Sequence, residues 1–135
     1  GLNVRECLDS LRELKENVSN REGDFDIDFE GDHVYRFIHS NDIDQIMQDE
    51  LESDTYILGC FIAWFLAGVL EIDIDVIEGF QAQEANEALG KLVLTMDKLE
   101  EVQSEYVRAD GYGHYFNHYN GGEIECDNYY IFKVG

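Results

Sequence analysis

The most distinctive string of chemically versatile residues in this sequence is Asp-Gly-Tyr-Gly-His-Tyr-Phe, at positions 110–116. Its two glycines are spaced as in the opening of a dinucleotide-binding loop, whose backbone N–H groups approach a phosphate. Phe116 stands where that loop needs a third glycine, and the string follows an expected helix instead of joining a strand to a helix. We therefore interpret it as a helix end, with Gly111 or Gly113 in the left-handed conformation.

Two histidines beside this string are the candidates for a metal site. His114 and His118 are four residues apart, which on a helix would place both rings on one face within reach of one metal ion. On a strand the two residues would be about 13 Å apart and could not share an ion. The flanking glycines and aromatic residues favour a strand, so the sequence predicts no metal site here.

Alternating aspartates at Asp24, Asp26 and Asp28 are a second candidate for metal binding, because Ca²⁺ prefers several carboxylate oxygens. An EF-hand loop that began at Asp24 would need a glycine at its sixth position and a glutamate at its twelfth. The chain has Phe29 and Tyr35 there. The aspartates therefore do not form such a calcium loop.

Catalytic motifs are absent from the sequence. It contains no G-x-S-x-G elbow, Walker loop, HExxH helix or kinase signature, and Cys60 lies in an apolar run where a thiolate is disfavoured. The sequence thus predicts no catalytic residue, no cofactor and no enzymatic activity. One alternative stays open: a small enzyme or ligand-binding domain that uses residues 110–119, with His114 or His118 as the active group.

The three cysteines, Cys7, Cys60 and Cys126, are odd in number, far apart and not part of a CxxC pair. They are typical of reduced thiols, so we expect a cytoplasmic protein, in the host cytoplasm if a phage encodes it. No secretory signal is visible. The one long uncharged stretch, residues 55–70, is shorter than a bilayer span usually requires, so no membrane partner is expected.

Length, composition and hydrophobic pattern predict the fold in which these residues lie. A chain of 135 residues with 44% hydrophobic residues can bury an ordinary core, so we expect one domain spanning residues 1–135. Helical spacing predicts an amphipathic helix over residues 3–17. Residues 24–30 alternate between apolar and acidic side chains, which predicts a half-buried strand paired through Gly31 and Asp32 with residues 34–38.

Further along the chain the pattern is mostly helical. We expect a short acidic helix that contains residues 43–51, then a central apolar helix at 54–70, and helical segments up to residue 109. Residues 114–119 and 129–134 are expected to form a second hairpin around Asn120-Gly121. The predicted fold class is α+β: five or six helices with a small antiparallel sheet made of hairpins at about 24–38 and 113–134.

Net charge is the strongest functional signal. The chain has 30 acidic and 9 basic residues, a formal charge of −21 and a pI near 4.1. No Lys or Arg occurs between Arg36 and Lys91, whereas twelve acids do. Ordinary surfaces mix both signs, because pairs of opposite charge help a helix and like pairs weaken it. Repulsion among so many like charges lowers the stability of the folded chain, which indicates that the charge is kept for another reason.

A surface of one charge sign attracts a groove lined with Lys and Arg, as the phosphates of DNA do, and repels nucleic acid itself. We therefore predict an inhibitory nucleic-acid mimic that blocks a basic nuclease, such as a restriction or CRISPR protein, and is encoded by a phage or mobile element. An immunity protein or antitoxin against a basic nuclease toxin is the runner-up. A surface tuned only for solubility, or for high salt, would look similar. The residues expected to bind the partner are Asp26, Asp28, Asp42, Asp44, Asp49, Glu50 and Glu52.

Overall fold

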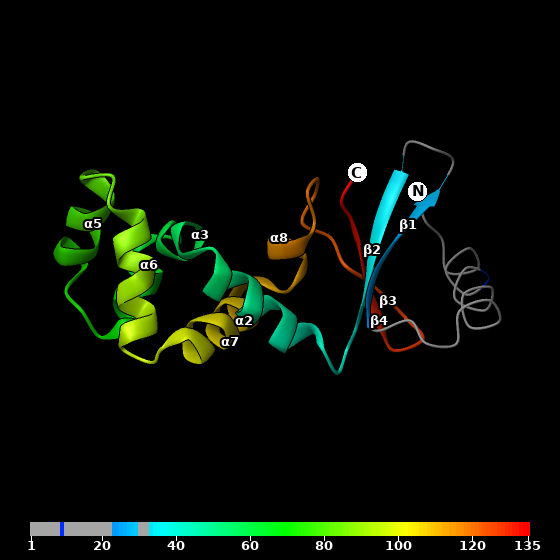
Figure 1. Ribbon diagram of the computed structural model, residues 1–135, viewed down its shortest axis with the longest axis horizontal. Helices are drawn as coiled ribbons and strands as arrows, with labels where there is room; N and C mark the ends of the chain where they lie inside the picture. The colour runs from blue at the N-terminus through cyan, green and yellow to red at the C-terminus, as the bar shows by residue number, and fades with distance from the viewer. Residues whose placement is uncertain (1–8, 10–22, 30–32) are drawn as a thin grey trace. The chain divides into compact units, whose positions relative to one another are not determined.

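The computed structural model describes residue 9, residues 23–29 and residues 33–135. In these parts the chain forms seven helices and one four-stranded antiparallel sheet, which confirms the helix-rich α+β class (Figure 1). The expected helix at residues 3–17 and the turn at Gly31 and Asp32 lie outside the described residues. The chain divides into two compact units, residues 1–43 with 110–135, and residues 44–109. The single domain stays a prediction.

The first unit contains the sheet, whose strands are β1 (Asp24–Phe29), β2 (His33–His39), β3 (Ile124–Cys126) and β4 (Tyr129–Lys133). Their order is β1-β2-β4-β3, and all neighbours are antiparallel. The two hairpins therefore join through β2 and β4 in one sheet, as the sequence predicted.

Both faces of the sheet carry aromatic side chains near its centre. On one face Phe25 stacks on Phe37 with ring centroids 5.3 Å apart, and Ile27 packs against the same cluster, so the alternation in β1 is confirmed for these residues. On the other face Phe116 stacks on Phe132 at 5.1 Å. Phe116 belongs to α8 (Gly113–Phe116). Phe37 and Ile38, consecutive residues of β2 on opposite faces of the sheet, are both fully buried.

The second hairpin differs from the prediction. Residues 113–116 form α8 instead of a strand, and the turn of the hairpin is Asp127-Asn128 instead of Asn120-Gly121. Asp127 and Asn128 have φ angles of 52° and 70°, the pair of positive values that a two-residue type I′ turn requires. Gly113 cannot carry a side chain, because a Cβ there would meet the backbone of Gly121 and Gly122.

The second unit is helical. Its helices are α2 (Ile43–Ser53), which begins in the first unit, α3 (Thr55–Gly59), α4 (Ala63–Leu70), α5 (Ile74–Ala82), α6 (Asn86–Thr95) and α7 (Leu99–Asp110), whose last residue belongs to the first unit. Its fully buried side chains include one or two from each helix: Met47, Leu51, Leu58, Leu66, Ile77, Leu89, Val93 and Val102. No helix among the described residues is both long and apolar enough to cross a bilayer.

The expected central helix at residues 54–70 is wrong, because the chain breaks into α3 and α4 after Gly59. At this break α3 crosses α6 closely: a Cβ on Gly59 would meet the Asn86 carbonyl, and one on Gly90 would meet the Thr55 carbonyl. Gln81 fixes the break, since its Nε2 donates to the carbonyls of Gly59 and Phe61 at 3.0 and 2.8 Å. As a result, several large apolar side chains of this segment are exposed.

Two cysteines also differ from expectation. Cys60 caps α3 and is an exposed free thiol, whereas the sequence placed it inside an apolar helix. Cys126 is disulfide-bonded, so the expectation of three reduced thiols is wrong for this residue. Disulfides persist mainly in oxidising compartments. The cytoplasmic localisation therefore stays a prediction, and the bond at Cys126 opposes it.

Candidate functional site: an exposed acidic surface

The two histidines of residues 110–119 do not share one helix or one strand. His114 is exposed on α8, and His118 lies beyond it, with its Nδ1 3.2 Å from the Val134 carbonyl oxygen. No group of three or more metal-ligating side chains occurs among the described residues. Gly111 has a φ of 80°, which confirms that the glycine string ends a helix in the left-handed conformation.

Cys60 does not have the surroundings of a catalytic nucleophile. The Asn86 Nδ2 donates to its sulfur at 3.2 Å. The hydrogen bond that the Tyr56 hydroxyl donates to Cys60 raises the pKa of Tyr56 above its ordinary value of 10.0, and the negative charge of a Cys60 thiolate acts in the same direction. An amide and a phenol with a raised pKa are poor general bases, so neither neighbour activates the thiol.

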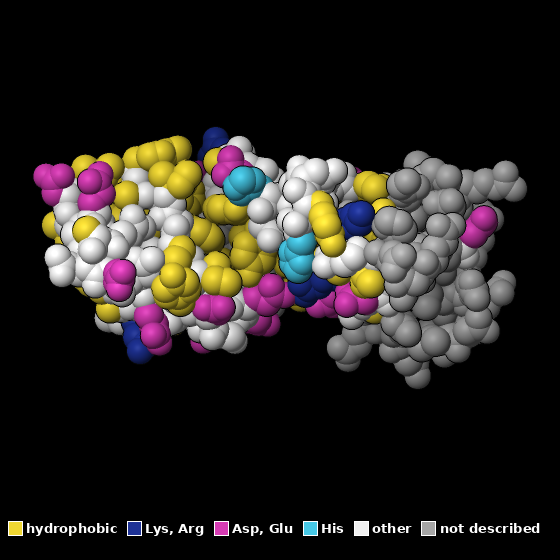
Figure 2. All heavy atoms as spheres, turned by 90° about the horizontal axis from the view of Figure 1, so that it is seen from above, with side chains coloured by type: hydrophobic (Ala, Val, Ile, Leu, Met, Phe, Trp, Pro, Cys, Tyr) yellow, Lys and Arg dark blue, Asp and Glu magenta, His cyan; other side chains and the backbone are white. Residues whose placement is uncertain are grey.

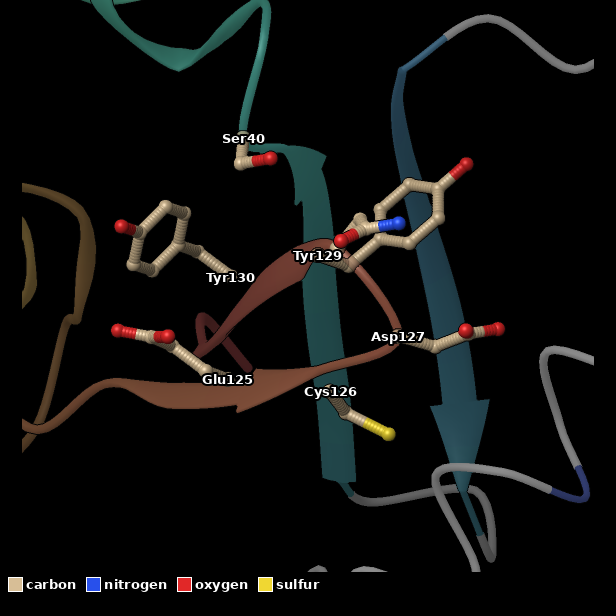
Figure 3. A pocket seen from close by; sticks show the side chains of 7 residues that line it. Ser40, Glu125, Cys126, Asp127, Tyr129 and Tyr130 are labelled. Carbon is tan, nitrogen blue, oxygen red and sulfur yellow. The ribbon is translucent and has the colours of Figure 1, made fainter.

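A hollow beside the β3–β4 turn, of about 330 Å³, is the first candidate cavity. Glu125 and Tyr130 lie on one side of the hairpin, whereas Asp127 points the opposite way, as Figure 3 shows. The two carboxylates of the hollow therefore do not converge on one point. This geometry does not supply the paired acid and base that hydrolytic chemistry needs.

A second hollow, of about 460 Å³, is lined by Asp24, Asp26, Arg36 and His118 among others. The Arg36 guanidinium already forms a forked ion pair with Asp24, with N–O distances of 2.8 and 2.7 Å, and its Cζ lies 5.2 Å from the centre of the Phe116 ring. Arg36 is thus engaged and not aimed at a ligand. Of the chemistry-bearing groups here, Asp26 is exposed and His118 contacts backbone.

The ion pair of Arg36 also lowers the net negative charge along the acidic strand β1. In the sheet register Asp26 lies directly opposite Arg36. The side chain of Arg36 pairs with Asp24, which is two residues earlier on the same strand. The row of carboxylates is therefore partly neutralised, unlike a row of phosphates. The backbone of Asp28 lies in β1 opposite Val34, and its side chain is outside the described part.

The acids of α2 are divided between a structural and an exposed role. The Asp44 carboxylate accepts a hydrogen bond of 2.9 Å from Gln103, whose side chain is only 1% exposed, so Asp44 also supports the α2–α7 contact. Asp49 and Glu52 are exposed, and Asp49 accepts from Gln45 at 2.8 Å. Glu50 is half-buried, and Asp42 is exposed just before the helix.

The seven predicted residues are thus distributed over both units. Asp26, Asp28 and Asp42 belong to the sheet unit, and the other four belong to the helical unit. Of the helical four, Asp44, Asp49 and Glu52 are exposed, and Asp44 also accepts the hydrogen bond from Gln103. The base-free window extends much further than these positions, because eleven of its twelve acids are exposed. Figure 2 shows acidic side chains at several places over the helical unit, around exposed hydrophobic ones.

Three of the helix ends carry an acid that the sequence analysis did not single out. Glu71, Glu84 and Asp97 follow α4, α5 and α6, and each has a φ of 57°. Glycine is the usual residue there, because the left-handed conformation costs other residues roughly 1–2 kcal/mol. A carboxylate near a helix C-terminus also opposes the helix dipole, which costs about 0.3–1 kcal/mol. The surface therefore keeps these acids against local stability.

A signal for these positions exists in the sequence. Each acid follows an apolar helical run and lies within two residues of the next capping or helical segment, where glycine is expected.

Comparison with protein-family models, with curated proteins and with solved structures found no match. The function must therefore be inferred from the acidic surface itself.

Proposed function

We propose that this protein is an acidic inhibitor that binds a basic nucleic-acid-binding protein and occupies its DNA- or RNA-binding groove. The observation that supports this most is the set of exposed acids at the ends of α4, α5 and α6, each in a conformation that favours glycine. A surface tuned for solubility alone would place its charge where it costs nothing. Acids retained at a cost indicate selection for the charge at those positions.

The target class follows from the sign of the charge. A groove that neutralises phosphates with Lys and Arg is recognised by carboxylates for the same reason, and binding releases the counterions of both surfaces. Restriction enzymes, CRISPR effectors and other nucleases have such grooves, and a phage or mobile element would benefit from blocking them. The proposal assigns no catalysis, cofactor or direct nucleic-acid binding to this chain.

The runner-up is an immunity protein or antitoxin that covers a site beside the groove of a basic nuclease. One observation favours it: the helical unit exposes large apolar side chains, which a phosphate-binding groove does not require. Both functions predict binding that weakens as salt rises. They differ in whether DNA and the protein compete for the target.

A pull-down from host lysate tests the proposal. The tagged protein is loaded at low salt and eluted with a salt gradient, beside a bait in which Asp49 and Glu52 are changed to Lys. We expect a basic nucleic-acid-binding protein to elute at moderate salt, and at lower salt from the variant bait. Recovery of no basic protein, or equal elution from both baits, would contradict the proposal.

A further inference from the structure

The break between α3 and α4 exposes an apolar strip that the acidic surface surrounds. Ile62 and Trp64 are 60% and 64% exposed, although the sequence predicted that this segment is buried. Trp64, Gly68 and Glu71 follow at intervals of four and three residues, so they share one face of α4 and its end. We call Trp64, Gly68 and Glu71 the Trp64 face.

Exposure of this kind has a cost that folding does not explain. Tryptophan has the largest side chain, and removal of its apolar area from water is strongly favourable. Phe65 and Phe61, beside Trp64 on the same segment, pack with Tyr106 at 6.1 and 4.8 Å. Trp64 meets the Phe65 ring edge-to-face, with ring centroids 6.5 Å apart, and most of its side chain nevertheless stays exposed.

Gly68 adds a second observation on the same face. It lies in α4, and apart from its chain neighbours and the backbone of the same helix no atom of the described residues is within 4 Å of the place where a Cβ would stand. No contact among the described residues requires glycine there, and glycine destabilises a helix interior relative to alanine. Bare backbone one turn from an exposed Trp is suited to the close approach of another chain.

The charge around the Trp64 face selects the occupant. The helical unit, residues 44–109, has 15 acidic and 3 basic residues, a formal charge of −12. Glu71 lies on the face, and the exposed Asp73 and Asp75 follow at the start of α5. Two copies of this chain would repel each other through these acids. A cationic surface would be attracted to the same place.

We propose that the Trp64 face is the centre of the partner interface and takes an amphipathic segment of the partner, whose apolar side chains are flanked by Lys and Arg. Trp64 is the anchor, Gly68 admits the backbone of the partner, and the surrounding acids pair with its basic residues at the rim. Central aromatic anchors with a charged rim are the usual arrangement of binding hot spots. The inference rests on the proposed function only for the basic character of the partner.

A peptide experiment tests the inference without knowledge of the target. The probe is a synthetic helical peptide of Leu and Lys with all Leu on one face, and its control is a scrambled peptide of the same composition. Binding is followed by calorimetry, and by the fluorescence of Trp64, which is the only tryptophan of the chain. We expect the ordered peptide to bind at least about tenfold more tightly than the scrambled one and to shift the emission to shorter wavelength.

Three variants make the test specific. Trp64→Ala and Gly68→Gln should each abolish the difference between the two peptides, and Gly68→Gln should do so while raising the unfolding midpoint of the free protein. Tyr119→Ala is the control, because Tyr119 is 62% exposed and lies in the other unit. It should keep the difference unchanged.

Several results would overturn the inference. Equal affinity for both peptides would mean that only charge matters, and an unchanged difference in Trp64→Ala and Gly68→Gln would place the apolar contact elsewhere. A dimer in sedimentation that Trp64→Ala abolishes would identify a second copy as the occupant. A recovered target that binds Trp64→Ala as tightly as the native protein would contradict this inference alone. Failure to recover any basic target would contradict the proposed function alone.

Discussion

Single residues at the helix ends show best that the acidic surface is maintained at the expense of stability. Glu71→Gly, Glu84→Gly and Asp97→Gly should each raise the free energy of unfolding, by roughly 1 kcal/mol, because each removes a left-handed non-glycine residue and a carboxylate at a negative dipole end. Urea unfolding of each variant measures the change.

The control for these variants is Glu78→Gly, an exposed acid inside α5. It removes the same charge but puts glycine in a helix interior, so stability should fall by about 0.5–1 kcal/mol. If the three helix-end variants lost stability as the control does, the acids would be structural caps, and the main support for the proposed function would disappear.

At the same scale, some residue roles were predictable from sequence and others were not. The alternation of Phe25 and Ile27 with aspartates predicted which side chains of β1 face the core, because a strand has a period of two. The pairing of Asp24 with Arg36 was not predictable, since it depends on which strands are neighbours and in which register. The same limit hid the contact of Asp44 with Gln103, which lies on α7.

At the scale of elements, the crossing of α3 and α6 determines the shape of the helical unit. Gly90→Ala should destabilise the protein by about 1–3 kcal/mol, because its Cβ would overlap the Thr55 carbonyl and push the helices apart. Gly68→Ala is the matched control: it makes the same change in a helix with open space around it, and should stabilise the protein by about 0.5–1 kcal/mol. Thermal unfolding compares the two. Stabilisation by both changes would contradict the close crossing.

The charged face of α2 gives the test of electrostatic steering. Asp49→Lys with Glu52→Lys should slow association with the target at low salt, and the effect should shrink as salt screens the charges. Asp44 is kept, because its loss would leave the buried Gln103 amide without this acceptor. Stopped-flow association rates at two salt concentrations measure the effect.

The control for α2 is Glu101→Lys with Glu105→Lys on α7, which changes net charge by the same amount. Lys98 lies 3.2 Å from Glu101, and Arg108 lies 3.7 Å from Glu105, so these acids are already partly neutralised. The control should slow association less. An equal loss of rate in the two pairs of variants would mean that net charge, and not a defined face, drives binding.

How far the elements were predictable depends on the range of the interactions behind them. Period-two and period-3.6 patterns predicted the first hairpin, α2 and α7, because these signals are local. The expected helix at residues 54–70 was wrong because the break after Gly59 lies against Gln81 and Asn86, contacts that are distant in sequence. The expected strand at 114–119 was wrong because Gly113 packs on Gly121 and Gly122, a loop contact that periodicity does not report.

For the candidate surface, too, local features were predictable from sequence and features that depend on distant contacts were not. The twelve acids of the base-free window could be counted in the sequence, and eleven of them are exposed in the structure. The Trp64 face could not be predicted, because an apolar run reads as core until the break after Gly59 turns part of it outward. Sequence thus indicated the charge of the surface but not its apolar centre.

At the scale of the whole molecule, a formal charge of −21 should make stability depend on salt. We expect the protein to be folded in dilute buffer, with a thermal midpoint that rises as added salt screens the carboxylates. Calorimetry would also show whether the two compact units unfold in one transition, as the predicted single domain requires, or in two. A chain unfolded below molar salt would favour adaptation to high salt instead of partner binding.

The central claim is that the acidic surface occupies the nucleic-acid groove of a basic target, and competition tests it most directly. The target recovered from lysate is bound to labelled duplex DNA, or to RNA if that is its ligand, and this protein is titrated in at constant ionic strength. The proposed function predicts that the nucleic acid is displaced and that added nucleic acid in turn displaces the protein. A ternary complex, with nucleic acid and protein bound to the target at the same time, would contradict it.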